Sequence, residues 1–312
     1  KKITGCCNLD TINDARILSY KHGFKHYVID IKHDFKKNIV DNFIKEYFAA
    51  RTPNPCVLCN TYIKWDILLE KANILNCEYI ATGHYANIKS LDKRYVLSKG
   101  IDHDKDQSYF LWGMSQDKLK RTKFPLGQYT KDNIKSLIKD LGYKKIYNKK
   151  ESYEICFIPD NNYRNFLHQN SSIKAKPGNF ILSNRSVIGQ HKGYPFYTIG
   201  QRKNLGISVG YPLYVIKIYA SKNEILLGPK SELYSNHCNV NNINMVKYNR
   251  ISKPIKAFIK IRYRDNGNLG TINSLSDNKV KITFDNDVAS ICPGQSAVFY
   301  ENNDVIGGGF IE

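Results

Sequence analysis

Apolar residues recur at helical spacing in the first half of the chain. Phe35, Ile39, Phe43 and Tyr47 stand four positions apart, so a helix over residues 34–50 would have one apolar side. Similar patterns predict helices in three other segments, and Gly23 is a plausible end for the first of them. These segments are residues 9–23, 62–75 and 130–142.

Short apolar runs lie between the predicted helices. HYVIDI (26–31) and EYIATGHY (78–85) are typical of strands, and strand–helix alternation predicts an α/β domain with a doubly wound parallel sheet. In such sheets ligands bind beyond the carboxyl ends of the strands, where Gly83 and His84 fall. The alternative for His84 is a loop histidine on the surface with no role in binding.

The pattern changes after about residue 160. Helical periodicity fades, and the run LYVIKIYASKNEILLG indicates a hairpin that turns at residues 221–223. Strand-length runs separated by turns then continue to the end, which favours a small β-barrel. The chain is therefore divided into a catalytic α/β domain (1–160), a small, mainly β central domain (161–230) and a C-terminal β-barrel (231–312).

The charge balance indicates a polyanionic partner. Lys and Arg total 47 against 28 Asp and Glu, a net charge of +19. The alternative is a composition rich in Lys, Asn, Ile and Tyr, as an AT-biased genome produces without selection for binding. No apolar run reaches the ~18 residues of a membrane span. Eight cysteines are too few and too irregular for a secreted disulfide scaffold, which favours a reducing cytoplasm.

Two cysteines three positions apart, Cys56 and Cys59, offer three kinds of chemistry. Structural zinc usually needs a second such pair, and the sequence has none. A thioredoxin-like pair would open a helix directly after a strand, whereas these follow Pro-Asn-Pro. The third possibility pairs Cys59 with the distant Cys156, one thiol carrying a persulfide and the other resolving it. Lys149 and Lys150 would favour a Cys156 thiolate; the alternative is a buried, inert cysteine within ICFI.

Six segments carry a resemblance to a known family. In chain order they read RTPNPCVLCN with IKW, YIATGHY, KDQSYFL, EICFI, TIGQRKNLG, and PGQSAVFY with GGGFIE. The same motifs run in this order through the tRNA-specific 2-thiouridylases, the MnmA family, and the match covers essentially all 312 residues. The resemblance implies an adenine nucleotide alpha-hydrolase-like fold for the catalytic domain.

The resemblance also implies a reaction. Family members use ATP, with Mg, to adenylate the carbonyl oxygen on carbon 2 of the wobble uridine in tRNAs for lysine, glutamate and glutamine. A persulfide sulfur then displaces AMP. Cys156 matches the persulfide cysteine, and Cys59 matches the other catalytic cysteine, which would release the sulfur and close a Cys59–Cys156 disulfide. The implied partners are tRNA and a sulfur-donor or relay protein in the cytoplasm, without membrane or DNA.

Other positions carry over from the family one by one. Gly83 matches an ATP contact, and the rest match residues that contact tRNA. In the catalytic domain the RNA-binding residues would be Asn54, Pro55, Cys56, His84, Lys105, Asp106 and Gln107, and in the barrel Arg262, Tyr263 and Gln295.

Two departures from the family pattern leave alternatives open. The family begins with a strand and an S-G-G-x-D-S loop that holds the ATP phosphates, and the chain is expected to start after both. One alternative is therefore a non-catalytic tRNA-binding remnant. Position 56 is Cys where many members have Asp. Another alternative is thus a [4Fe–4S] cluster held by Cys56, Cys59 and Cys156.

Overall fold

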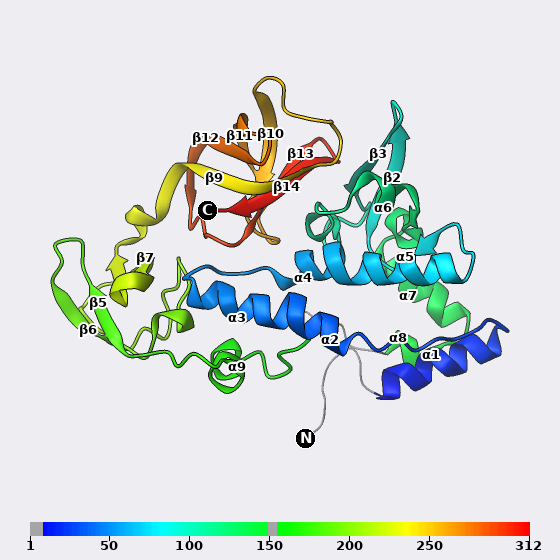
Figure 1. Cartoon of the computed structure of the whole chain (residues 1–312), viewed down its shortest axis with the longest axis horizontal. Coiled ribbons are helices and arrows are strands. Elements are labelled where there is room, and N and C mark those ends of the chain that lie inside the picture. The colour runs from blue at the N-terminus through cyan, green and yellow to red at the C-terminus, as the bar shows by residue number, and fades with distance from the viewer. Residues whose placement is uncertain (1–8, 149–154) are drawn as a thin grey trace.

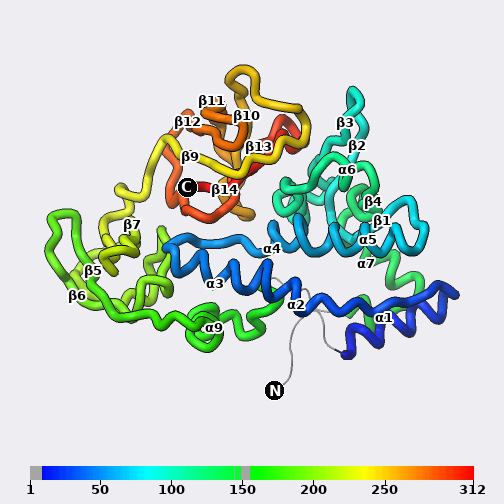
Figure 2. The backbone as a smooth tube through the Cα atoms, viewed as in Figure 1, coloured from blue at the N-terminus to red at the C-terminus, as the bar shows by residue number. Residues whose placement is uncertain are grey.

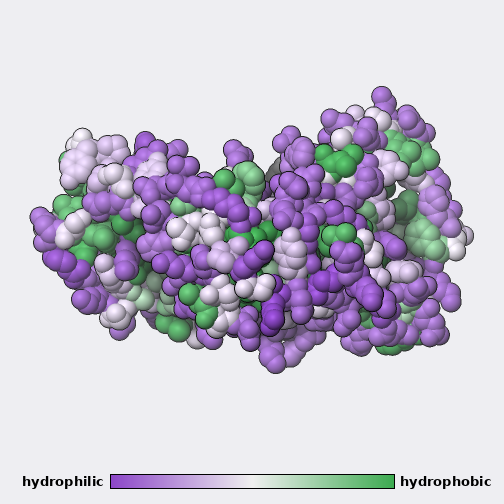
Figure 3. Space-filling model, turned by 90° about the horizontal axis from the view of Figure 1, so that it is seen from above, coloured by the Kyte–Doolittle hydropathy of each residue, from purple (hydrophilic) through white to green (hydrophobic). Residues whose placement is uncertain are grey.

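The computed structural model describes residues 9–148 and 155–312, which form three regions (Figure 1). Two long helical rods run below a C-terminal barrel, and a small β domain lies at one end of these rods. The backbone tube in Figure 2 shows the same arrangement, with the 51–54 loop running beneath the barrel. In the view from above, Figure 3 shows a largely hydrophilic surface with scattered apolar side chains.

The predicted helices of the first region are confirmed. The first is α1 (Leu9–Lys21), after which Gly23 takes a positive φ of 71°. The first rod consists of α2 (Lys32–Phe35), the π-helical turn η1 (Lys36–Val40) and α3 (Asp41–Phe48). The second rod consists of α4 (Pro55–Leu58), the π-helical turn η2 (Cys59–Lys64) and α5 (Trp65–Ile74). Ile39, Phe43 and Tyr47 are buried, as their four-residue spacing predicts.

The parallel sheet is short. Strand β1 (Ile80–Ala81) pairs in parallel with β4 (Thr122–Lys123), which confirms a strand within residues 78–85. The predicted strand over 26–31 is wrong: this segment has no strand, and Tyr27 and Val28 are exposed. No described strand pairs with this segment, so an apolar pattern alone does not make it a strand.

The remaining elements of the first region include a hairpin that the sequence analysis missed. Asp92 and Lys93 both have positive φ, at the turn between β2 (Ala86–Leu91) and β3 (Arg94–Lys99). The predicted helix over 130–142 is confirmed as α7 (Lys131–Asp140), which begins with a capping box of Thr130 and Asn133. The other elements are η3 (Ser108–Phe110), α6 (Gln116–Lys120), η4 (Pro125–Gln128) and α8 (Lys144–Tyr147).

The central region is a four-stranded sheet with one helix. The predicted hairpin is confirmed, with Asn223 in the left-handed conformation at its turn. Helix α9 (Tyr163–Asn170) lies in the part of the chain where helical periodicity fades. It is short, and Leu167 alone among its residues is buried, so it leaves little periodic signal. The strands are β5 (Gly178–Ile181), β6 (Val187–His191), β7 (Tyr214–Tyr219) and β8 (Glu224–Gly228), in the order β6-β5-β8-β7.

The predicted C-terminal barrel is confirmed. Six antiparallel strands follow the order β13-β10-β11-β12-β9-β14, and pairing of β13 with β14 closes them. They are β9 (Tyr234–Met245), β10 (Ile255–Lys260), β11 (Asn268–Ser276), β12 (Lys279–Ala289), β13 (Ser296–Glu301) and β14 (Asp304–Ile311). A Cβ on Gly308 would lie 2.8 Å from the Trp112 ring, so this glycine lets the barrel approach the first region closely.

Candidate functional site

The segment that carries Cys56 and Cys59 is the start of the second helical rod. Pro55 occupies the first turn, a position that suits its fixed φ and missing N–H. Cys59 opens the π-helical turn η2, a geometry often found at functional sites. Cys56 is exposed and Cys59 is partly buried, while Asn60 is buried and donates through Nδ2 to the Phe110 carbonyl at 3.1 Å. Both thiols therefore lie at the edge of the rod rather than in a core.

Cys156 lies on a loop that is anchored by its neighbours. Phe157 packs edge-on against Phe35 and Phe43, with ring centroids 5.7 and 5.3 Å apart, and Ile158 is buried. Cys156 itself is exposed, so the alternative of a buried, inert cysteine is wrong. The apolar neighbours fix the loop while leaving the thiol accessible. Lys149 and Lys150, whose effect on this thiol was predicted, lie outside the described residues.

The two catalytic candidates, Cys59 and Cys156, lie on segments that pack against the same helical rod. The rod that carries Cys59 packs through α4 and η2 against α2 and η1, and Phe157, next to Cys156, packs against Phe35 and Phe43 of the same first rod. Segments nearly a hundred residues apart in the chain thus meet on the Lys32–Phe48 rod. The Cys59–Cys156 disulfide remains a prediction.

The described residues contain no group of three His, Cys, Asp or Glu side chains that could hold a metal ion. A cluster on Cys56, Cys59 and Cys156 therefore does not fit the arrangement of the described chain. A cleft of about 990 Å³ lies between the two rods and the barrel. Asn54, Val57 and Thr61 line it, whereas Cys56 and Cys59 do not.

His84 is buried among aromatic rings. It is 9% exposed and lies 5.4 Å from the Trp65 ring and 5.9 Å from the Phe124 ring, so the alternative of a surface histidine is wrong. Lys64 can only donate, so its 3.4 Å contact makes Nε2 the acceptor, and Nδ1–H donates to Thr82 Oγ1 at 2.8 Å. Burial, assisted by the Lys64 charge, lowers the pKa of His84 to about 3.

Gly83 stands just beyond β1 and is exposed. A Cβ there would make only an ordinary 3.5 Å contact with Leu126, so the position is open on one side. It lies at the carboxyl end of a parallel strand, as expected for a ligand contact. Its contact with ATP remains a prediction.

Residues Lys105–Gln107 lie in a turn that hydrogen bonds to their own side chains stabilise. The buried Asp106 carboxylate accepts hydrogen bonds from the Gly100 and Ser108 amides and from the Ser108 hydroxyl. Gln107 accepts from the Tyr85 amide through Oε1 at 2.9 Å. Lys105 is partly exposed. Asp106 and Gln107 therefore stabilise this turn through hydrogen bonds within the protein. Their contact with tRNA remains a prediction.

The three barrel candidates differ in their surroundings. Arg262 is exposed. Tyr263 packs against Phe110, with ring centroids 4.5 Å apart, so it joins the barrel to the first region. Gln295 donates through Nε2 to the Thr52 carbonyl at 2.9 Å and therefore contacts the loop that precedes Asn54 and Pro55. The structure brings Gln295 to the cysteine-bearing segment.

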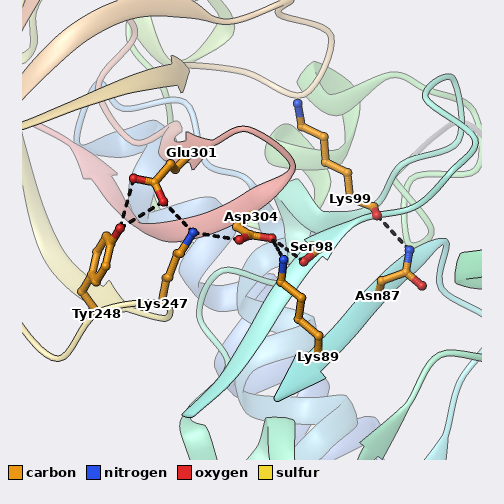
Figure 4. A network of polar contacts seen from close by, with 8 residues as sticks. All are labelled: Asn87, Lys89, Ser98, Lys99, Lys247, Tyr248, Glu301 and Asp304. Atoms are coloured by element: carbon orange, nitrogen blue, oxygen red, sulfur yellow. Dashed lines mark hydrogen bonds and ion pairs between the residues drawn. The ribbon is translucent and has the colours of Figure 1, made fainter. Parts of the chain in front are cut away.

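Sequence reasoning missed a polar network between the hairpin and the barrel (Figure 4). Lys247 lies 2.5 Å from Glu301 and 2.8 Å from Asp304, and both Lys89 and Ser98 approach the other Asp304 oxygen. Figure 4 shows these side chains converging from β2, β3, β13, β14 and the segment after β9. No motif contains them all, because they come from three distant parts of the sequence.

Sequence reasoning also overlooked Tyr109, although it stands within the KDQSYFL motif. Its hydroxyl donates to the Ser296 carbonyl of the barrel at 2.9 Å. The tyrosine is fully buried, and burial raises the pKa of its hydroxyl far above the ordinary value. The sequence offered one signal for this residue: a tyrosine within a motif, because a buried tyrosine usually has a hydrogen-bond partner for its hydroxyl.

The structure is that of a multidomain protein in which an α/β domain carries both candidate cysteines and is followed by two β domains. Three family models match in this order: the tRNA methyl transferase HUP domain over residues 1–160, the tRNA methyl transferase PRC-barrel domain over 164–229, and the aminomethyltransferase beta-barrel domain over 235–311. The HUP match confirms the predicted fold class of the first region.

Relatives in three bacteria carry the name tRNA-specific 2-thiouridylase MnmA. The protein of Amoebophilus asiaticus is 51% identical over 316 aligned residues, covering 100% of this chain and 84% of the relative. That of Cytophaga hutchinsonii is 49% identical, with 100% and 86% covered, and that of Salinibacter ruber 46%, with 99% and 82% covered. The chain belongs to the MnmA family of tRNA-specific 2-thiouridylases.

Proposed function

We propose that this protein is a tRNA-uridine 2-sulfurtransferase that thiolates the wobble uridine of tRNAs for lysine, glutamate and glutamine. The observation that supports this proposal most directly is that Cys59 and Cys156 lie on two segments packed against one helical rod, with Cys156 exposed. A sulfur carrier must be reached by a donor, and its resolving thiol must be able to approach it. Membership of the MnmA family supports the substrate class.

The chemistry balances with these two thiols. ATP activates the carbonyl oxygen on carbon 2 as an adenylate, releasing pyrophosphate. The outer sulfur of a Cys156 persulfide bonds to carbon 2, and AMP leaves with the oxygen. The Cys59 thiolate attacks the inner sulfur, which frees the transferred sulfur and closes the Cys59–Cys156 disulfide. An external thiol then reduces this disulfide.

The persulfide route is preferred to an iron–sulfur route. It uses Cys59 and Cys156 alone, whereas a cluster needs Cys56 as well, and the described residues do not group three such ligands. Cys56 is then a neighbour of Cys59, one helical turn away and exposed. Gly83, at the end of β1, is the described residue proposed to contact ATP.

The proposed partners follow from exposure and charge. The net charge of +19 suits a polyanion such as tRNA, with the exposed Arg262 among the contacts. An exposed Cys156 can receive sulfur from a donor or relay protein. The described residues contain no helix able to cross a bilayer. Because both thiols must be reduced between turnovers, a cytoplasmic location is part of the proposal.

The test is to express the complete parent reading frame in bacteria that lack their own thiouridylase, then measure 2-thiouridine in purified tRNA by mass spectrometry. Restored 2-thiouridine supports the proposal. Tight tRNA binding without any 2-thiouridine, in cells that supply a sulfur donor, would instead support the non-catalytic tRNA-binding protein.

A further inference from the structure

The loop before the cysteine-bearing helix lies where all three regions meet. The Thr52 amide donates to the Pro293 carbonyl of the barrel at 2.7 Å. The Thr52 hydroxyl approaches the Thr198 hydroxyl of the central region at 3.4 Å. Arg51, at the start of the loop, is clamped by two 2.6 Å hydrogen bonds to Glu46 of α3. The loop is thus fixed by contacts from outside its own helix.

One barrel side chain makes two polar contacts with this loop. Gln295 Nε2 donates to the Thr52 carbonyl at 2.9 Å and to the Pro53 carbonyl at 3.3 Å. Its own backbone is held by a bond from its amide to the Cys292 carbonyl and by one from the Ile311 amide to its carbonyl. A side chain on a fixed backbone therefore ties two successive carbonyls that precede the helix.

The barrel therefore holds two successive residues of the loop, Thr52 and Pro53, through Pro293 and Gln295. Asn54 follows them, and its side chain makes no capping bond to the helix. The helix that carries Cys59 starts at the following residue, Pro55.

The close approach also explains a glycine of the PGQS motif. Gly294 has a φ of +89°, and a Cβ there would lie 2.9 Å from Arg51 Cβ and 3.0 Å from the Thr52 nitrogen and oxygen. A side chain at this position would push the barrel away from the loop. The segment is therefore built for contact with the loop.

We propose that Gln295 is a positioning residue, which sets the start of the Cys59 helix rather than binding RNA. An amide has two N–H donors, and the two loop carbonyls occupy both, so Nε2 has none left for a phosphate. This inference rests on the proposed function for its kinetic consequence. It differs from the role implied by the family resemblance, which gave Gln295 a contact with tRNA.

The test compares Gln295→Glu with Gln190→Glu in the full-length protein. The first change replaces the donor with a carboxylate facing two carbonyls; the second makes the same change at an exposed site on β6. Local loosening of the first helical turn should raise alkylation of Cys59 by about threefold relative to the exposed Cys77, as read by mass spectrometry. Single-turnover thiolation should fall about tenfold, because misplacement of a reacting group costs rate.

Affinity for tRNA and its salt dependence should stay unchanged in Gln295→Glu, and Gln190→Glu should match the wild type throughout. Weaker tRNA binding with unchanged Cys59 alkylation would overturn the positioning role and restore the RNA contact. Unchanged alkylation, affinity and rate would overturn it as well. Alkylation is measured without tRNA or ATP, so failure of the proposed function leaves this readout intact.

Discussion

The Lys247 ammonium lies 2.8 Å from the Asp304 carboxylate, at the junction between the barrel and the β2–β3 hairpin. Their side chains are 11% and 9% exposed, so this ion pair is largely removed from water. Lys89, from the hairpin, contacts the other carboxylate oxygen at 2.7 Å. One carboxylate therefore holds two cations from different regions of the chain.

Replacing this carboxylate should loosen the junction. Asp304→Asn leaves Lys247 with Glu301 as its remaining carboxylate, at 2.5 Å, and removes the charged acceptor of Lys89 and Ser98. About 2 kcal/mol of unfolding free energy should be lost, as for a hydrogen-bonded charge. The matched control is Asp285→Asn, which breaks the exposed pair with Lys256 on the barrel and should cost less than ~1 kcal/mol. Urea unfolding of both variants measures the difference. Equal losses of unfolding free energy in the two variants would mean that burial of the Asp304 ion pair adds nothing to stability.

The same network predicts a pH dependence of stability. Burial opposes ionisation of Asp304, but hydrogen bonds from Lys247, Lys89 and Ser98 outweigh it and keep the pKa of this carboxyl below its ordinary 3.8. A lowered carboxyl pKa gives stability that is present above the unfolded pKa and lost as pH falls through the folded one. The Asp304 contribution should therefore disappear below about pH 4. Asp304→Asn should flatten this part of the stability curve, and an unchanged curve would contradict the assignment.

His84 should stay neutral through the physiological range. Its pKa is lowered to about 3, so the unfolded chain binds a proton below pH 6.5 while the folded chain does not. Because of His84, the free energy of unfolding should fall by about 1.4 kcal/mol for each pH unit below pH 6.5. The imidazole NMR signals should not shift between pH 5 and 8. A titration midpoint near 6.5 would contradict the burial of His84.

How much could be predicted from the sequence depends on the range of the interactions. The helix over 34–50 could be predicted, because its apolar spacing is local, and so could the barrel strands. The strand expected over 26–31 could not, because strand formation needs a neighbour that local pattern does not reveal. For the site, motif resemblance indicated Cys59 and Cys156. It could not show that His84 is buried, because the rings of Trp65 and Phe124 come from distant segments.

Arg262 should contribute charge to tRNA binding. Arg262→Ala should weaken binding and lower the slope of log affinity against log salt by about one unit, since one phosphate contact is lost. Lys281→Ala, at an exposed barrel position without a predicted contact, is the control. Filter binding over a range of salt concentrations gives both slopes. An unchanged slope with unchanged affinity would make Arg262 a surface arginine without a role in binding.

Cys56 should not be needed for a metal cluster. Anaerobically purified protein should be colourless and free of iron, and Cys56→Ala should still thiolate tRNA with a persulfide donor. The iron–sulfur route would instead give a brown protein with broad absorbance near ~400 nm that is lost in Cys56→Ala. Iron analysis and absorbance spectra decide between them.

The most direct measurement of the central claim is the 2-thiouridine content of tRNA made by Cys156→Ser in the full-length protein. The change removes the proposed sulfur carrier but leaves the anchoring contacts of Phe157 and Ile158 in place. The account predicts no 2-thiouridine, with tRNA affinity unchanged. Cys77→Ser, at another exposed cysteine, should retain normal 2-thiouridine. Normal 2-thiouridine from Cys156→Ser would contradict the assignment of Cys156 as the persulfide carrier.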